Sequence, residues 1–280
     1  MKYLNSSDMK RRNVPAGALA LLALLFVNHS PADAASVQEV KVRGKIIVGI
    51  QGDNAPWGFV NSAGVQDGLD ADIAKLFGKE LGVTVEFIPL NVANRIPALV
   101  TGKVDVLFAT MAMTEERAKS MQYSKPYAAN TIALLAPKKE NIKTAADLAG
   151  KEIGVPRASA QDKAVTESAP PTATIRRFDD DAAAIQAMLS GQVQAVGGNL
   201  FYLPRLNASQ PDIYEKKIEF LNVYNGAGTR LNERDWNETV NAFIDKIKAN
   251  GDLDKIYRKW MGVPLPEFPA SLLNIPFTVK

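Results

Sequence analysis

The chain alternates between segments with two different hydrophobic periods. The stretch 45–50 is almost continuously apolar, which predicts a strand covered on both faces. Asp70 suits the N-cap of the helix that follows, and we expect strands over 83–90 and 104–109 with a short helix over 96–101 between them. Apolar residues at helical spacing form the buried stripe of the first helix: Ile73, Leu76, Phe77 and Leu81. This βαβαβ order implies a parallel sheet with right-handed crossovers.

The same alternation continues in the second half of the chain. The pattern predicts strands over 131–137, 152–155 and 193–196 and helices over 145–148, 161–167 and 182–190. The carboxylates of 179–181 precede the last of these helices. They form either an acidic, metal-binding cluster or a helix N-terminus, where carboxylates meet the helix dipole. We favour the helix N-terminus.

The C-terminal part of the chain predicts a long amphipathic helix and a Pro-rich tail. The apolar stripe of the helix comprises Val240, Phe243, Ile244, Ile247, Leu253, Ile256, Tyr257 and Trp260. Gly251 is the expected break in this helix, and Gly262 ends it. We expect the tail over 263–280 to be extended and packed on the surface. It either braces its own domain or touches another subunit.

Residues 1–34 have the features of a secretory signal peptide. A basic cluster at 10–12 precedes an apolar run over 14–27, which is shorter than the roughly 20 residues that span a bilayer. The small-x-small sequence at 32–34 then predicts cleavage after Ala34. The alternative is a buried N-terminal helix. The order of the three features favours the signal peptide, and hence a periplasmic protein.

Removing this leader changes which chemistries the chain can carry. The 280 residues have a net charge of +3, no cysteine and one histidine, His29. Without residues 1–34 the chain has 29 basic and 28 acidic residues and neither histidine nor cysteine. This composition excludes Ser-His-Asp triads, Cys-His dyads, thiolate metal sites and a lipidated cysteine, and it disfavours nonspecific nucleic-acid binding. No later apolar run approaches 18 residues, so we expect no membrane span.

Five segments between residues 44 and 262 occur in a distinctive order. They are VGI and APWGF within 48–59, GLDADIA at 68–74, NRIPAL and GKVD within 94–105, MTEER and YSKPY within 113–127, and DKIY and KW within 254–260. Together they resemble the family 3 extracytoplasmic solute-binding proteins, the polar amino-acid receptors of ABC importers. Each segment alone is a weak signal, but five in order are a strong one.

The resemblance implies an α/β fold of the two-lobed periplasmic-binding-protein type, in which parallel-sheet lobes are joined by two hinge strands. Lobe 1 would comprise 36–130 plus 223–280, and lobe 2 would comprise 131–222. The chain would cross between the lobes near 129–130 and 222–223. The lobes would close on a ligand, with no cofactor and no metal.

The resemblance also assigns a carboxylate site to the helix that follows the strand at 104–109. Arg117 matches the arginine that clamps the ligand α-carboxylate, with the N–H groups of the helix start as further donors. Thr110 and Ala112 occupy positions beside that carboxylate, where Ala112 offers only its backbone N–H. The alternative for Arg117 is an ordinary surface salt bridge.

Three further positions of lobe 1 belong to the expected site. Asn54 and Trp57 match the aromatic wall of the family's cleft, although the usual aromatic residue at position 54 is missing. Trp57 either stacks on the ligand or belongs to the core. Arg95 is either a second cationic contact for the ligand or the partner of an acidic residue.

On lobe 2, Arg157, Ser159 and Ala160 lie in a strand-to-helix turn that aims N–H groups and a hydroxyl at the ligand in this family. Ser159 can also serve as an ordinary helix cap. Asn199 stands where the family has an aspartate that holds the ligand α-ammonium. Asparagine offers no countercharge, so the binding free energy of a cationic amine is weaker by about 1–3 kcal/mol.

We therefore expect a ligand with a carboxylate, extra negative or polar groups, and a weakly held or substituted amine. On this hypothesis Asn199→Asp gains affinity for plain amino acids. The family resemblance alone predicts an ordinary α-amino acid as the ligand, and the asparagine at position 199 weakens that prediction.

These features favour a monomeric extracytoplasmic receptor that captures a small carboxylate-bearing solute, an amino acid or a derivative, and delivers it to the membrane permease of an ABC importer. Such a receptor has no catalytic residues. One alternative is a dehydratase-type enzyme on the same fold, for which Asp53 and Asp72 are nominated without a paired-carboxylate spacing to support them. Another is a ligand-sensing module, which we disfavour because the sequence has no adjoining membrane span.

Overall fold

Strands and helices alternate through residues 35–208 and 211–279, which are the residues that the computed structural model describes. The predicted signal peptide and its cleavage site lie outside them. The strands are β1 (Lys45–Ile50), β2 (Asp53–Asn54), β3 (Gly58–Val60), β4 (Gln66–Asp67), β5 (Thr84–Pro89), β6 (Val106–Leu107), β7 (Gln122–Pro137), β8 (Glu152–Pro156), β9 (Thr174–Phe178), β10 (Ala195–Asn199) and β11 (Tyr214–Thr229).

The helices are of α and 3-10 type. They are α1 (Val37–Arg43), α2 (Leu69–Leu81), η1 (Val92–Asn94), α3 (Arg95–Val100), α4 (Glu115–Ala118), η2 (Ala145–Leu148), α5 (Ala160–Ser168), α6 (Asp181–Leu189), α7 (Tyr202–Leu206), α8 (Arg234–Ala249) and α9 (Asp252–Met261). Within the described part of the chain, none is long and apolar enough to cross a membrane.

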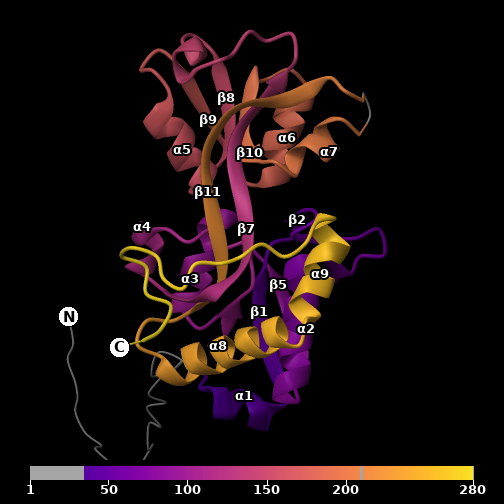
Figure 1. The fold of residues 1–280 in the computed structure, drawn as a ribbon, viewed down its shortest axis with the longest axis vertical. Coiled ribbons are helices and arrows are strands. Elements are labelled where there is room, and N and C mark those ends of the chain that lie inside the picture. The colour runs from indigo at the N-terminus through magenta and orange to yellow at the C-terminus, as the bar shows by residue number, and fades with distance from the viewer. Residues whose placement is uncertain (1–34, 209–210, 280) are drawn as a thin grey trace, which may run out of the picture. The chain divides into compact units, whose positions relative to one another are not determined.

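Two long strands connect the two halves of the main sheet. The strand order is β5-β1-β6-β11-β7-β10-β8-β9, and β7 and β11, of 16 residues each, pair antiparallel. At one end β1 pairs in parallel with β5 and β6, and at the other β8 pairs in parallel with β9 and β10. Figure 1 shows β7 and β11 running from one group of strands to the other. The predicted α/β fold with two lobes and two connecting strands is confirmed.

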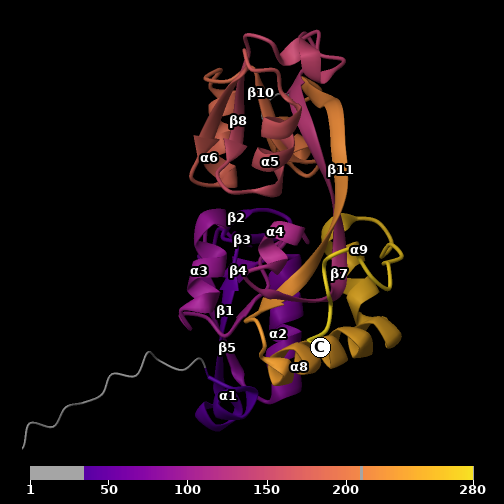
Figure 2. The ribbon, with the colours of Figure 1, turned by 90° about the vertical axis from the view of Figure 1, so that its left-hand side faces the viewer.

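Helices cover both faces of the parallel strands. Figures 1 and 2 both place α5 and α6 on opposite sides of β8 and β10, and α2 and α3 on opposite sides of β1. With both faces covered, the open places are the carboxyl ends of the strands, where the loops gather and where ligands bind in such sheets.

Most sequence-predicted elements are present with shifted ends. β10 covers Ala195–Asn199 instead of 193–196, and β7 begins at Gln122 instead of 131. The pattern did not predict β11 as a strand. Gly251 separates α8 from α9, as expected. Asp180 caps α6 by accepting a hydrogen bond from the N–H of Ala183 at 2.7 Å, which confirms the helix N-terminus.

Asp70 is not the N-cap of α2, because Gly68 occupies that position. Gly68 has a φ of 116°, and a Cβ atom there would lie 2.5 Å from the carbonyl oxygen of Trp57, so only glycine fits. Asp70 is the second residue of the helix. Its buried carboxylate accepts hydrogen bonds from the N–H of Thr110 at 2.7 Å, the hydroxyl of Thr110 at 3.0 Å and the hydroxyl of Tyr127 at 2.7 Å. These bonds fix the backbone that follows β6.

The Pro-rich tail packs against its own lobe. Ile275 and Phe277 are buried in a core cluster with residues of β6 and α3. The side chain of Gln122 donates to the carbonyl of Pro276 at 2.6 Å, and that of Asn241 donates to the carbonyl of Phe277 at 2.7 Å. The tail therefore contributes to the core.

We predict that Phe277→Ala lowers the free energy of unfolding by about 3 kcal/mol, because it removes a buried aromatic ring. Urea unfolding of the variant against wild type measures this difference. Leu273→Ala is the matched control, since Leu273 lies in the same tail and is 83% exposed. Equal stability of the two variants would contradict the packing of the tail.

We also predict a pH dependence of stability from Asp70. Burial raises the pKa of Asp70 to about 6 from an ordinary value of 3.8, against hydrogen bonds from Tyr127 and Thr110 that lower it. Because the folded protein holds this proton more tightly than the unfolded chain, stability falls as pH rises from about 4 to about 6, by about 2 kcal/mol. Asp70→Asn removes this contribution.

Urea unfolding at pH 4 and pH 7 tests the prediction, with wild type expected to lose about 2 kcal/mol more than Asp70→Asn over this interval. Asp254→Asn is the control. A hydrogen bond from Arg258 lowers the pKa of Asp254, so the contribution of Asp254 to stability rises with pH, whereas that of Asp70 falls. Identical pH profiles for wild type and Asp70→Asn would show that burial of Asp70 does not shift its titration.

Candidate functional site

A small pocket brings together residues from both lobes, and we call it the inner pocket. It is lined by Gln51, Asn54, Val92, Arg95, Thr110, Ala112, Arg117, Asn130, Ile132, Ser159, Ala160, Gln161, Asp181 and Asn199. Its volume of about 20 Å³ holds about one water molecule. Eight of the ten residues that the sequence nominated lie here: Asn54, Arg95, Thr110, Ala112, Arg117, Ser159, Ala160 and Asn199.

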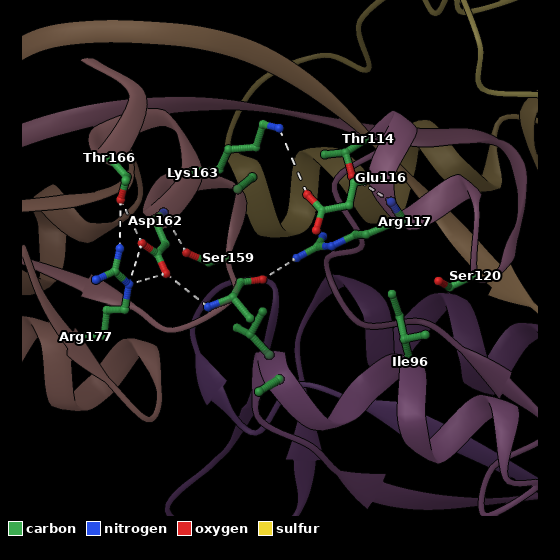
Figure 3. Close-up of a pocket in the computed structure, with 14 residues that line it drawn as sticks. Ile96, Thr114, Glu116, Arg117, Ser120, Ser159, Asp162, Lys163, Thr166 and Arg177 are labelled. Atoms are coloured by element: carbon green, nitrogen blue, oxygen red, sulfur yellow. Dashed lines mark hydrogen bonds and ion pairs between the residues drawn. The ribbon is translucent and has the colours of Figure 1, made fainter. Parts of the chain in front are cut away.

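A larger cavity of about 420 Å³ adjoins the inner pocket, and we call it the outer cavity. The two share Val92, Arg117, Ser159 and Ala160. Figure 3 shows that most charged groups of the outer cavity are paired with one another, whereas Arg117 reaches the carbonyl of Ala158. Asp162 accepts from Arg177 at 3.0 Å, and Lys163 lies 4.0 Å from Glu116. Apart from Arg117, the charged side chains named here for the outer cavity are therefore already paired with opposite charges.

Arg95 is the least satisfied group of the inner pocket. It begins α3 and is only 3% exposed. Its Nη1 donates to the carbonyl of Ala109 at 2.7 Å, whereas its Nε and Nη2 have no hydrogen-bond partner among the described residues. Burial lowers the pKa of Arg95, and the charge of Asp181 opposes that shift. A buried guanidinium with two unused nitrogens is suited to an anionic ligand.

Arg117, the predicted carboxylate clamp, spans the two lobes. Its Nη1 donates to the carbonyl of Ala112 at 3.2 Å and its Nη2 to the carbonyl of Ala158 at 3.1 Å. Ala112 donates its own N–H to the carbonyl of Thr110 at 2.9 Å. Both donors of Thr110 bond to Asp70. The hydroxyl and the N–H that the sequence assigned to the ligand are thus used within lobe 1 in this structure.

On lobe 2, Ser159 is the N-cap of α5, and its hydroxyl accepts from the N–H of Asp162 at 2.9 Å. The capping role that the sequence predicted for Ser159 is confirmed. Asn199 ends β10 in a fully buried position. Its Oδ1 accepts from the N–H of Phe201 at 3.0 Å.

Two nominated residues lie elsewhere. Trp57 is fully buried in the lobe 1 core, with its ring 5.5 Å from that of Phe201 in an edge-to-face arrangement, and it does not line the inner pocket. Of its two sequence interpretations, the core one describes its position. Arg157 turns outward and pairs with Asp179 at 3.2 Å, with more than half of its side chain exposed.

Asp181 lines the inner pocket but was not nominated from the sequence. It is 1% exposed, and its carboxylate accepts hydrogen bonds from the side chains of Gln51 and Tyr202, with the amide of Gln161 at 3.5 Å. Burial and the negative charge of Asp53 together raise the pKa of Asp181 to about 6. The signal was present in the acidic run at 179–181, for which we favoured a helix N-terminus over an acidic, metal-binding cluster.

The described residues contain no group of three or more histidine, aspartate or glutamate side chains placed to hold a metal ion. The inner pocket instead presents a buried cation, a buried anion and several amides. Such a lining can bind and orient a small polar molecule.

Comparisons with known proteins agree with this fold. Residues 46–263 match the model of the bacterial extracellular solute-binding proteins, family 3. The L-cystine-binding protein TcyJ of Escherichia coli strain K12 is 27% identical over 88% of this chain and 92% of its own length. The ABC transporter glutamine-binding protein GlnH of Bacillus subtilis is 29% identical over 79% of this chain and 83% of its own.

Among solved structures, an ancestral amino acid-binding protein, AncCDT-1, described as a precursor of cyclohexadienyl dehydratase, superposes with a TM-score of 0.74. It is 32% identical and covers 80% of this chain and 98% of its own. The match of the family model spans most of the chain. This protein therefore belongs to the family 3 bacterial extracellular solute-binding proteins.

Proposed function

We propose that this protein is an extracytoplasmic receptor that captures an amino acid or a close derivative between its lobes and delivers it to an ABC importer. The observation that carries the proposal is Arg95, a buried cation with two unused nitrogens in a pocket shared by both lobes. The relatives TcyJ and GlnH are named for the amino acids they bind, which supports an amino acid as the ligand.

Ligand binding would proceed by movement of the lobes. The inner pocket holds about one water molecule, so the lobes must part to admit an amino acid. We place the division at 130/131 and 222/223. In the β7–β11 ladder Asn130 pairs with Val223 and Thr131 with Asn222, so both crossings fall at the same level. A short change of backbone angles there would open the site.

An enzymatic role is the second candidate, because AncCDT-1 is described as a precursor of a dehydratase. Asp53, nominated for that chemistry, does not line the inner pocket, and its carboxylate accepts from the N–H of Ala182 at 3.1 Å. Asp72 accepts hydrogen bonds from Lys259 and Trp260 on α9. Neither is placed as an acid–base group of the pocket, so we propose binding without catalysis.

The remaining parts of the proposal follow from the sequence. We propose secretion to the periplasm after cleavage at Ala34, action as a monomer, and a membrane permease as partner. The description of the family as extracellular supports the location.

A thermal-shift screen on ligand-stripped protein starting at Ala35 tests the function. We expect at least one of L-cystine, L-glutamine, L-arginine and L-histidine to stabilise the protein. A ligand at 100 times its dissociation constant adds about 2.7 kcal/mol, or a rise in Tm of about 5 to 10 °C. If neither these amino acids nor amine-free carboxylates shift Tm, the receptor function is wrong.

We predict that Arg95→Gln weakens binding of the amino acid that passes this screen by about thirtyfold or more, because it removes one partner of a buried charge pair. Isothermal titration measures the dissociation constants. The exposed Arg234→Gln on α8 is the matched control and should bind as wild type does. Unchanged affinity in Arg95→Gln would mean that the ligand carboxylate does not contact this guanidinium.

A further inference from the structure

Two buried side chains of opposite charge face the inner pocket from different lobes without pairing. Arg95 lies on α3 and Asp181 at the start of α6, and both are at least nine-tenths buried. Neither has an opposite charge within 4.0 Å among the residues that the structure describes. An ionised group buried without a partner is costly. A zwitterion carries both of the missing partners.

The unpaired amides of the pocket have the same complementarity. Among the residues that the structure describes, the Oδ1 atoms of Asn54 and Asn130 have no hydrogen-bond partner, and neither do the Nε and Nη2 atoms of Arg95. An α-ammonium group provides three N–H donors, and an α-carboxylate accepts several bonds. The pocket therefore has free acceptors as well as free donors, as an amino acid with an unmodified amine requires.

We infer that Asp181 supplies the countercharge for the α-ammonium of the ligand, in place of the aspartate that Asn199 replaces. This inference rests on the proposed function and names a specificity-determining residue for it. Asn199 is neutral, and its Oδ1 already accepts from Phe201. Asp181 is the acidic residue that lines the inner pocket. The ligand it selects is an amino acid with a free amine.

The carboxylate of Asp181 is held in position by neutral donors. The side chain of Gln51 binds one oxygen, and those of Tyr202 and Gln161 bind the other. A carboxylate has about four acceptor sites, so these bonds leave room for one more donor. Gln51 comes from lobe 1, whereas Tyr202 and Gln161 come from lobe 2. With the lobes closed, the carboxylate is therefore held by donors from both lobes.

The charges around Asp181 determine how its role depends on pH. Its pKa is raised to about 6 by burial and by the charge of Asp53 on β2, against the hydrogen bond from Tyr202 and the charges of Arg95 and Arg205, which lower it. An ammonium ion bound to the carboxylate would favour its ionised form. Binding should therefore release protons near pH 6 and weaken as pH falls below that value.

The test compares the free and Nα-acetyl forms of one amino acid in wild type and Asp181→Asn. The probe is the one of L-cystine, L-glutamine, L-arginine and L-histidine that shifts Tm most. We expect Asp181→Asn to lose about thirtyfold or more in affinity for the free amino acid. Affinity for the acetylated form should stay within about threefold. Asp179→Asn, which removes an exposed carboxylate two residues away, is the control and should bind as wild type does.

Asn199→Asp provides a test that does not depend on the folding of Asp181→Asn. If the countercharge is already present at Asp181, a second carboxylate adds no more than about threefold in affinity and lowers it where the two anions repel. A gain of tenfold or more for plain amino acids would overturn the inference. It would favour the hypothesis that position 199 lacks a needed charge.

Isothermal titration at pH 5.5 in two buffers of different ionisation enthalpy gives an independent readout. Wild type should release protons on binding the amino acid, and Asp181→Asn should release fewer. Equal proton release and equal affinity in the two proteins would overturn the inference while leaving the receptor function intact. Stabilisation of wild type by amine-free carboxylates alone would likewise overturn the inference and leave the receptor function intact. Binding of neither amino acids nor amine-free carboxylates would refute the proposed function itself.

Discussion

The antiparallel pairing of β7 with β11 is the constraint on which the rest of this structure depends. Each strand belongs to the sheets of both lobes, so the parallel groups β5-β1-β6 and β10-β8-β9 are held by one shared ladder. Asn130 and Ile132 of β7 line the inner pocket close to the proposed crossing. Residues of the β7–β11 pairing that join the lobes therefore also form part of the ligand site. Movement at this level changes the pocket directly.

Three buried charged residues have two different roles. Asp70 is structural, whereas Arg95 and Asp181 line the inner pocket. Asp70 and Asp181 are equally buried and each accepts three hydrogen bonds, but Asp70 does not line the inner pocket, and its bonds to Thr110 and Tyr127 fix the loop after β6. Arg95 keeps two nitrogens without partners, and Asp181 has no cation within 4.0 Å in the described part of the protein. Burial alone does not mark a binding residue, whereas a buried charge that lines a pocket shared by both lobes is a candidate for one.

Local signals in the sequence predicted the parts of the fold that depend on neighbours along the chain. The cap at Ser159 and the break at Gly251 are of this kind. The full length of β7 and β11 could not be predicted, because it is set by pairing between segments about 90 residues apart. Asp181 and Arg157 show the same limit within the site. Both follow parallel strands, but only packing against lobe 1 and α7 decides that Asp181 points inward and Arg157 outward.

Placing the countercharge on Asp181 makes ligand selection part of lobe closure. Gln51 of lobe 1 bonds to Asp181, and Asp53 of lobe 1 accepts from the N–H of Ala182, so the start of α6 contacts the opposite lobe at two points. Closing around a ligand without an ammonium group leaves the carboxylate buried and uncompensated, which opposes the closed state. A ligand with an ammonium group neutralises that charge and favours closure by its differential interaction with the two states. Because Arg95 and Arg117 can attract any carboxylate from lobe 1, discrimination for a free amine arises when lobe 2 closes.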